Sequence, residues 1–266
     1  MTSVLGDPIA DLASISELAA ALTSARATLD PLLLDRRLRK HGADLAAIAL
    51  RMNAHASATL EGAEVPFEEF GMAQSSPVAR VADGVLEAYG TLRGHVGQPV
   101  RQVWAALASV AGREYLDEAA RGRPRKAGEP LLDPLHLGLD IEPEDVAVRL
   151  AMLAELLHHP TAAPALAVAA IAQAELASLQ PFGAGNGVVA RGFSHIVLAA
   201  RGADPDFFAM TDVGLQSLGR SAYVRALQAY NSGEQEGIVG WCLHYAAAFE
   251  RGATLSRDTL DALAAA

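Results

Sequence analysis

Residues Gln180 to Arg191, with the sequence QPFGAGNGVVAR, are the part of the chain whose residue types and spacing come closest to a chemical site. Glycines leave backbone N–H groups accessible because they carry no Cβ. The start of a following helix adds the positive end of its dipole. The stretch therefore predicts a cradle for an anion such as a phosphate. On the local pattern alone, a tight interhelical turn that needs glycine for close packing explains the residues equally well.

The stretch resembles the signature of the Fic family, HPFx(D/E)GNGRxxR. The positions that match in register are Pro181, Phe182, Gly185, Asn186, Gly187 and Arg191. Three positions depart: Gln180 replaces the histidine, Ala184 replaces the acidic residue and Val188 replaces the first arginine. Upstream, SATLEG at residues 57–62 resembles the family's inhibitory-helix motif, (S/T)xxxE(G/N), with Glu61 as its glutamate. The resemblance covers roughly residues 45 to 250.

The resemblance implies a mostly helical fold and, in active family members, transfer of AMP from ATP to a protein hydroxyl. In those enzymes the histidine accepts the proton, the acidic residue holds Mg²⁺ and the glycine turn binds phosphates. In inhibited members the glutamate pairs with the second arginine, which otherwise contacts the γ-phosphate. Carried over to this chain, the inhibitory-like pair is Glu61 and Arg191. The nucleotide or anion contacts fall on Gly183, Gly185, Asn186, Gly187 and Arg191.

The three departures remove the groups that the family reaction needs. The amide of Gln180 cannot act as a general base near neutral pH. Ala184 supplies no carboxylate for Mg²⁺, which proteins bind through one or two carboxylates together with substrate phosphates. Val188 removes a cation that would offset charge on the transferring phosphoryl group. We therefore expect no catalytic residue and no metal ligand here, with ATP or another nucleotide as the ligand that the resemblance leaves open.

Several other residues are candidates to replace the missing general base. The family often has a second histidine seven residues before the catalytic one, where this chain has Gln173. His195 should point away from the turn, and His158 and His159 end a helix. The face of His55 is open, and His136 lies in a segment that could reach the site. None of these is the expected base.

We expect Glu61 and Arg191 to lie within about 4 Å of each other, as salt-bridged groups do, and to be at least partly buried. The planar guanidinium favours two parallel hydrogen bonds with the carboxylate. The pair is interpreted first as a structural fastener, because leaving one buried charge unpaired costs about 3–5 kcal/mol. The other interpretation is a gate on a pocket that binds a nucleotide without cleaving it.

Three functions follow from these observations. The first is a catalytically degenerate Fic-domain protein that binds or regulates without AMPylation and keeps a residual nucleotide or phosphate pocket. The second is a divergent transferase that moves a nucleotidyl or other phosphate-containing group onto a protein hydroxyl with a non-standard base. The third is an oligomeric scaffold whose pocket has no role. A protein partner and a homodimer both stay open.

Composition limits the setting in which the protein works. The 266 residues carry a net charge of −10, so we expect no nucleic-acid partner and no anionic membrane surface. The basic run from Arg121 to Lys126 is interpreted as a solvated loop. The one cysteine, Cys242, excludes an intramolecular disulfide and is expected as a small buried residue. No signal peptide or membrane span is recognised, which indicates a cytoplasmic protein.

Abundant alanine and leucine predict an almost all-α protein. Helices are expected over residues 15–28, once or twice within 30–62 with a stop at Gly62, and over 76–94 and 100–120. Further helices are expected from Pro143, over residues 164–179 as an all-apolar buried helix, after the glycine turn, and twice in the C-terminal part.

The segment from Arg121 to Pro143 is rich in proline and glycine, which excludes a continuous helix. It sits where the family has its flap hairpin, with residues 131–132 and 135–139 as candidate strands. We predict an N-terminal helical region over residues 1–95, a Fic-like core over 96–252 and a C-terminal tail over 253–266.

Overall fold

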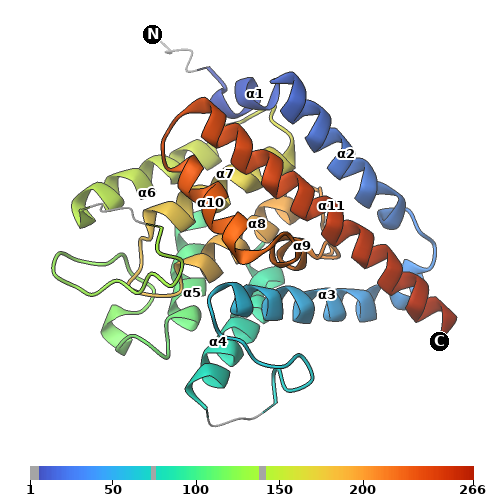
Figure 1. Cartoon of the computed structure of the whole chain (residues 1–266), viewed down its shortest axis with the longest axis horizontal. Helices are drawn as coiled ribbons and strands as arrows, with labels where there is room; N and C mark the ends of the chain where they lie inside the picture. Colours follow the sequence, from blue (N-terminus) through green and yellow to red (C-terminus); the bar gives the residue numbers. More distant parts are fainter. Residues whose placement is uncertain (1–5, 73–75, 138–141) are drawn as a thin grey trace.

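The computed structural model describes residues 6–72, 76–137 and 142–266, and within these residues it contains helices and no strand (Figure 1). The all-α prediction is confirmed. The α-helices are α1 (Pro8–Ala13), α2 (Ser16–Leu33), α3 (Leu38–Leu60), α4 (Pro77–Thr91), α5 (Val100–Ala111), α6 (Pro143–His158), α7 (Ala165–Leu179), α8 (Asn186–Ala200), α9 (Thr211–Leu218), α10 (Arg220–Tyr230) and α11 (Gln235–Ala265). Two short 3₁₀ helices, η1 (Leu92–His95) and η2 (Glu118–Ala120), lie before and after α5.

Helices α7 and α8 pack against each other at the centre of the molecule (Figure 1). Apart from Ala165 and Glu175, every residue of α7 is buried, which confirms the sequence prediction of an apolar helix covered on all sides. All but the last residue of α8 are buried as well. The six residues between the two helices hold the glycine turn, so the turn is fixed at both ends by the most enclosed part of the fold.

The other helices form a shell around this pair. The long helix α11 packs against α2, α9, α10 and α3, while α5 covers α8 and α6 covers α7. Helix α3 packs against α4 and α9. Its C-terminal end lies close to the glycine turn, so Glu61, the C-cap residue, contacts Arg191 there. The buried Cys242, on α11, is free as expected, and burial raises the pKa of its thiol to about 12.

Most of the expected helices are present with shifted ends. Helix α3 stops before Gly62, whose φ of +86° suits glycine and confirms the predicted stop. Pro77 and Pro143 each occupy the first turn of their helix, as predicted. Helix α5 ends at Ala111, earlier than expected, and the short helices α1 and α9 were not predicted. The residues expected as a C-terminal tail belong almost entirely to α11.

The predicted flap hairpin is wrong for the residues that the structure describes. Residues 131–132 and 135–137 form no strand in the described structure, and positions 138 and 139 lie outside the described residues. The side chain of Asp133 instead accepts hydrogen bonds from the backbone N–H groups of Leu135 and Leu137, at 3.2 and 2.8 Å. An aspartate that bonds the backbone ahead of it favours a turn over an extended ladder. The predicted division into three regions stays a prediction.

Within the described residues, no helix combines the length and the apolar character that a bilayer crossing requires.

The contact between α9 and α11 depends on glycine at close quarters. A Cβ built on Gly214 would lie 1.9 Å from the carbonyl oxygen of Ala248, and one built on Gly252 would lie 2.3 Å from that of Met210. Gly214→Ala should therefore lower the free energy of unfolding by about 1–3 kcal/mol or more, because backbone atoms have to move apart. Urea denaturation of the purified chain measures the change.

Gly240→Ala is the matched control, because Gly240 lies within α11 and nothing approaches its Cβ position within 4 Å. Replacing an exposed glycine inside a helix should stabilise the protein by about 0.5–1 kcal/mol. Equal changes in the free energy of unfolding for the two substitutions would show that α9 and α11 pack less closely than these Cβ distances imply.

Candidate functional site

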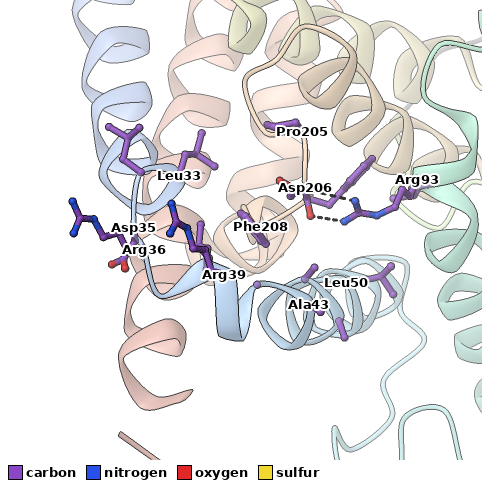
Figure 2. A pocket seen from close by; sticks show the side chains of 17 residues that line it. Leu33, Asp35, Arg36, Arg39, Ala43, Leu50, Arg93, Pro205, Asp206 and Phe208 are labelled. Atoms are coloured by element: carbon purple, nitrogen blue, oxygen red, sulfur yellow. Dashed lines mark hydrogen bonds and ion pairs between the residues drawn. The ribbon is translucent and has the colours of Figure 1, made fainter. Parts of the chain in front are cut away.

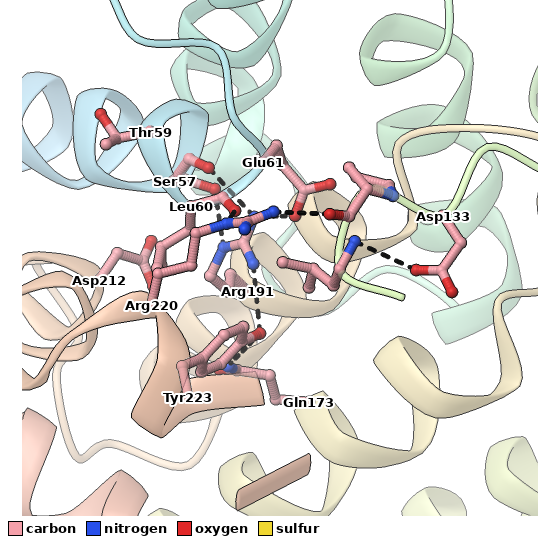
Figure 3. A network of polar contacts seen from close by, with 12 residues as sticks. Ser57, Thr59, Leu60, Glu61, Asp133, Gln173, Arg191, Asp212, Arg220 and Tyr223 are labelled. Atoms are coloured by element: carbon pink, nitrogen blue, oxygen red, sulfur yellow. Dashed lines mark hydrogen bonds and ion pairs between the residues drawn. The ribbon is translucent and has the colours of Figure 1, made fainter. Parts of the chain in front are cut away.

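Arg191 lies in the second turn of α8 and its side chain is completely buried. Helix α7 ends at Gln180 in a left-handed conformation with φ of +45°, and α8 begins after Gly185, whose φ is +77°. These two bends reverse the chain within six residues. Arg191 is thereby aimed from the central helix toward the ends of α3 and α10 (Figure 3).

Hydrogen bonds from two neighbouring helices satisfy the guanidinium. Nη2 of Arg191 lies 2.7 Å from Oε1 of Glu61, whose side chain is 10% exposed. Nε donates to Oγ of Ser57 at 2.9 Å, and Nη2 also donates to the Ser57 carbonyl oxygen at 3.2 Å. Nη1 donates to the hydroxyl of Tyr223 at 3.2 Å. The expected proximity and burial of the pair are therefore present.

The expected pair of parallel hydrogen bonds between Arg191 and Glu61 is not formed, which corrects that detail. A single Nη2–Oε1 bond joins them, and Nε bonds Ser57 instead. Glu61 stands at the C-cap of α3, one turn beyond Ser57. Because one α-helical turn separates the two acceptors, they meet different edges of the guanidinium rather than the same edge.

A second buried polar group lies behind Arg191 and was missed in the sequence. The carboxylate of Asp212, on α9, accepts from the hydroxyl of Tyr89, and its Oδ2 lies 3.1 Å from Nε2 of His195. The side chain of Asn53 accepts from the Asp212 backbone N–H at 3.0 Å. Four helices supply these residues, so no local sequence pattern could indicate them.

The pKa of His195 reflects two opposing effects. Burial lowers it, because the charged imidazolium loses its hydration, but the carboxylate of Asp212 favours the proton and the net pKa is raised. Burial and the same carboxylate raise the pKa of Tyr89 well above its usual value. In the folded protein the tyrosine is therefore a neutral donor and His195 holds its proton to higher pH than a free histidine.

Atoms of neighbouring segments lie close against three glycines in and just after the turn. A Cβ on Gly185 would lie 2.8 Å from Cβ of Ala111, and one on Gly183 would lie 3.0 Å from a methyl carbon of Leu116. A Cβ on Gly187 would lie 2.0 Å from Oε1 of Glu61. The glycines thus allow close packing, and the group packed against the first turn of α8 is itself an anion. The carboxylate of Glu61 stands where the sequence predicted an external phosphate.

Asn186 holds the turn together instead of facing outward. Its Oδ1 accepts from the backbone N–H of Phe182 at 2.9 Å, and its Nδ2 donates to the Phe182 carbonyl oxygen at 2.7 Å. Both ends of the amide are used within the turn. As the site stands, the side chain therefore has a structural role, and the predicted contact with a nucleotide stays a prediction.

The segment after η2 lies over the turn and is fastened to its backbone. The backbone N–H of Arg125 donates to the Pro181 carbonyl oxygen at 2.8 Å, and that of Leu132 donates to the Gly183 carbonyl oxygen at 2.9 Å. The cavity left between this segment, Glu61 and the start of α8 has a volume of about 10 Å³. That is close to the smallest space that holds one water molecule.

The cavity shows which predicted residues the fold brings together. Its walls include Glu61, Gln180, Asn186 and Gly187, and Arg191 reaches it through Glu61. Gly183 instead lines a separate pocket of about 280 Å³, bounded among others by Tyr115, Leu116, Asp117 and Glu129. The predicted anion-contacting residues are therefore divided between two sides of the turn.

The three positions that depart from the Fic signature are all buried. Gln180 is 6% exposed, Ala184 is fully buried and Val188 is 4% exposed within the apolar core. A carboxylate at position 184 would have to replace a methyl group in that enclosed place. Within the described part of the chain, no three His, Cys, Asp or Glu side chains are grouped so that they could hold a metal ion. The residues present do not fit a bound Mg²⁺.

None of the histidines considered as a replacement base lines the cavity beside Gln180. Nε2 of His55 lies 2.7 Å from the Val65 carbonyl oxygen, and its ring packs on two phenylalanines. His195 belongs to the buried Asp212 network. His136 is exposed between two buried leucines, and His158 and His159 lie at the end of α6.

Removing the carboxylate of Glu61 tests whether the pair fastens α3 to α8. Glu61→Ala should lower the free energy of unfolding by as much as about 3 kcal/mol, because the fully buried guanidinium loses its nearest counter-charge. Thermal and urea denaturation measure the change. Glu87→Ala is the control, since Glu87 pairs with Arg113 at the surface and should cost less than about 1 kcal/mol. Similar losses in the two variants would contradict a fastening role.

The raised pKa of His195 makes a pH-dependent contribution to stability. Because the folded state binds this proton more tightly than the unfolded state, the contribution is complete below the unfolded pKa of about 6.5 and is lost as pH rises through the folded pKa. Between pH 5.5 and 9, the native melting temperature should therefore fall more than that of His195→Gln. His159→Gln, at an exposed position, should keep the native profile. A native-to-His195→Gln difference that is constant across this range would contradict the assignment.

Comparison with known proteins supports the fold through structure alone. No family model matches the chain, and no curated protein matches it in sequence. Solved structures do match. A Fic family protein from Desulfovibrio desulfuricans G20 aligns with a TM-score of 0.67 and 19% identity, over 91% of this chain and 74% of that one.

Two further structures agree. A fragment of Fic-1 from C. elegans aligns with a TM-score of 0.67 and 18% identity, over 91% of this chain and 73% of the fragment. A Fic domain containing signaling protein from Bacteroides thetaiotaomicron VPI-5482 aligns with a TM-score of 0.63 and 14% identity, over 93% of this chain and 97% of that one. With the two sequence motifs meeting at one buried ion pair, these alignments identify the architecture: the chain has the Fic fold.

Proposed function

We propose that this chain is a catalytically degenerate Fic-domain protein that binds or regulates without transferring AMP, and that its own Glu61 closes the residual nucleotide pocket. The observation that carries the proposal is the position of the Glu61 carboxylate. It lies against Gly187 at the start of α8 and bonds Arg191, the one cation of the signature that the sequence retains. An anionic phosphate would need the same place.

The chemistry of the surrounding residues favours binding over transfer. Gln180 offers an amide where the family has its base, and Ala184 offers a methyl group where the family holds its metal. A general base contributes about 10²- to 10⁴-fold to a proton-transfer step. Loss of this base, together with the cation that Val188 does not supply at the phosphoryl group, leaves only orientation and the charge of Arg191 to assist the reaction.

Nucleotide binding would require an opening of the site. The 10 Å³ cavity cannot admit a phosphate, so Glu61 and the segment that contains Leu132 and Asp133 would have to move. Each ligand then binds only the fraction of molecules that is open, and its apparent affinity falls by that fraction. The proposed pocket is therefore one whose occupancy depends on the strength of the Glu61–Arg191 contact.

Titration of ADP and ATP into native protein and into Glu61→Ala tests this proposal. Native protein should bind with a Kd above about 1 mM, and Glu61→Ala should bind at least tenfold more tightly, because Arg191 and the first turn of α8 become available to a phosphate. Isothermal titration calorimetry measures both, without added metal and with Mg²⁺. Glu61→Gln, which keeps the shape but loses the charge, should fall between them and serves if Glu61→Ala is too unstable.

A transfer assay with α-labelled ATP separates binding from catalysis. Neither native protein nor Glu61→Ala should label itself or a generic protein substrate above background, because the base and the metal ligand are missing. Glu87→Ala controls for a nonspecific effect of losing one carboxylate. Labelling by Glu61→Ala that disappears in a second variant at Asn186 would overturn the non-AMPylating assignment and support the divergent transferase.

A further inference from the structure

A groove of about 970 Å³ lies on a part of the molecule that the glycine turn does not use (Figure 2). It opens between the turn that joins α2 to α3, the first half of α3, η1 and the segment that joins α8 to α9. None of its lining residues lines the cavity beside Glu61. The groove is therefore a separate feature, and its chemistry can be considered on its own.

The floor of the groove is a smooth, uncharged face of α3. Its residues are spaced at helical intervals and are small up to the last: Gly42, Ala43, Ala46, Ala47 and Leu50. Ala43 and Ala47 are exposed, so no element of the described chain covers this face fully. Small side chains on one helix allow the backbone of a second helix to approach closely, as ridges pack into grooves.

The walls are apolar. Phe207 and Phe208, which are buried, form one side, and the half-buried Leu33 and Leu38 lie on the other. Leu34, at the rim, is 83% exposed, the highest value among the exposed large hydrophobic residues of the described chain. An exposed apolar surface rimmed by charged groups is typical of a site that meets another protein.

Two arginines at one end of the groove have no acidic partner. Arg36 and Arg39 are exposed, and the guanidinium of neither takes part in a hydrogen bond or ion pair within the described residues. Their neighbours differ, because Arg37 pairs with Asp35 and Asp261, and Arg93 pairs with Asp206. The groove thus ends at two unpaired cations, within a protein whose net charge is −10.

We propose that this groove binds an amphipathic helix of a partner protein, with the acidic side chains of that helix lying over Arg36 and Arg39. The apolar face of the partner helix lies along the small residues of α3 and between the walls of the groove. The charge of the two arginines selects an acidic partner and fixes its direction. A helix in a groove is recognised through apolar anchors at i, i+3 or i+4, and i+7.

A helix fits this groove better than a small anionic molecule does. Small-ligand sites enclose most of the ligand and aim a few buried polar groups into the cavity. Here the cations are exposed at one end, and the uncharged face of α3 continues for more than two helical turns, from Gly42 to Leu50. The shape and the separation of the cations from the apolar floor match an extended amphipathic partner.

The test is a displayed library of helical peptides about 16 residues long, selected on the full-length chain. Enriched peptides should carry apolar residues at helical spacing and Asp or Glu at one end. Synthetic copies, labelled with fluorescein, are then titrated with protein by fluorescence polarisation. Arg36→Glu/Arg39→Glu and, separately, Ala47→Trp should each weaken binding at least about tenfold, by charge repulsion and by filling the groove.

Matched variants separate the groove from general effects. Arg101→Glu changes an exposed arginine on α5, which does not line the groove, and should bind like the native protein. Peptides with Lys in place of Glu should recover affinity for Arg36→Glu/Arg39→Glu but not for the native chain. All substituted positions are exposed, and melting temperatures check that each variant is folded.

Two outcomes would overturn the proposal. One is that no peptide is enriched, or that the enriched peptides bind Ala47→Trp and Arg36→Glu/Arg39→Glu as tightly as native protein. The other is that analytical ultracentrifugation shows the chain associating with itself and Ala47→Trp abolishing that association, which would assign the groove to a second copy of the chain.

Discussion

The buried charge of Arg191 is the constraint on which the rest of the site depends. A guanidinium with no exposed surface needs hydrogen-bond acceptors and a counter-charge from the protein, because water cannot supply them. Ser57 and Glu61 at the end of α3 and Tyr223 on α10 provide these contacts. The ends of two shell helices are thereby fixed to the central helix. This structural need accounts for the pairing of Glu61 with Arg191 without any catalytic role.

The same contact fills the anion cradle from within. The start of α8 favours a negative charge, and Glu61 supplies one from a neighbouring helix, so both the helix dipole and Arg191 are satisfied by a single carboxylate. An external phosphate has to compete with a group that is already attached to the chain. The structural and the gating interpretations of the pair therefore do not exclude each other. Under the proposed function, the strength of the Glu61–Arg191 contact would also set how often the pocket opens.

Sequence reasoning succeeded where a local pattern or a recognisable motif carried the signal. The apolar α7, the stop at Gly62 and the pairing of Glu61 with Arg191 each follow from a local pattern or a motif. The strands expected at residues 131–132 and 135–137 failed because Asp133 bonds its own backbone, a choice that composition alone does not reveal. The Asp212 network could not be predicted, since its members come from four helices and none has a distinctive neighbourhood.

The two buried clusters are connected through α8. Arg191 and His195 are one helical turn apart, and two cations at that spacing repel each other. Each is matched by a carboxylate from a different helix: Glu61 from the end of α3 and Asp212 from α9. Asp212 also favours the charge on Arg191, and so it contributes to both pairs. The raised pKa of His195 follows from this arrangement, because the carboxylate of Asp212 favours the charged imidazolium more than burial disfavours it. The electrostatics of the site thus extend beyond the glycine turn, to α9 and to Tyr89 on α4.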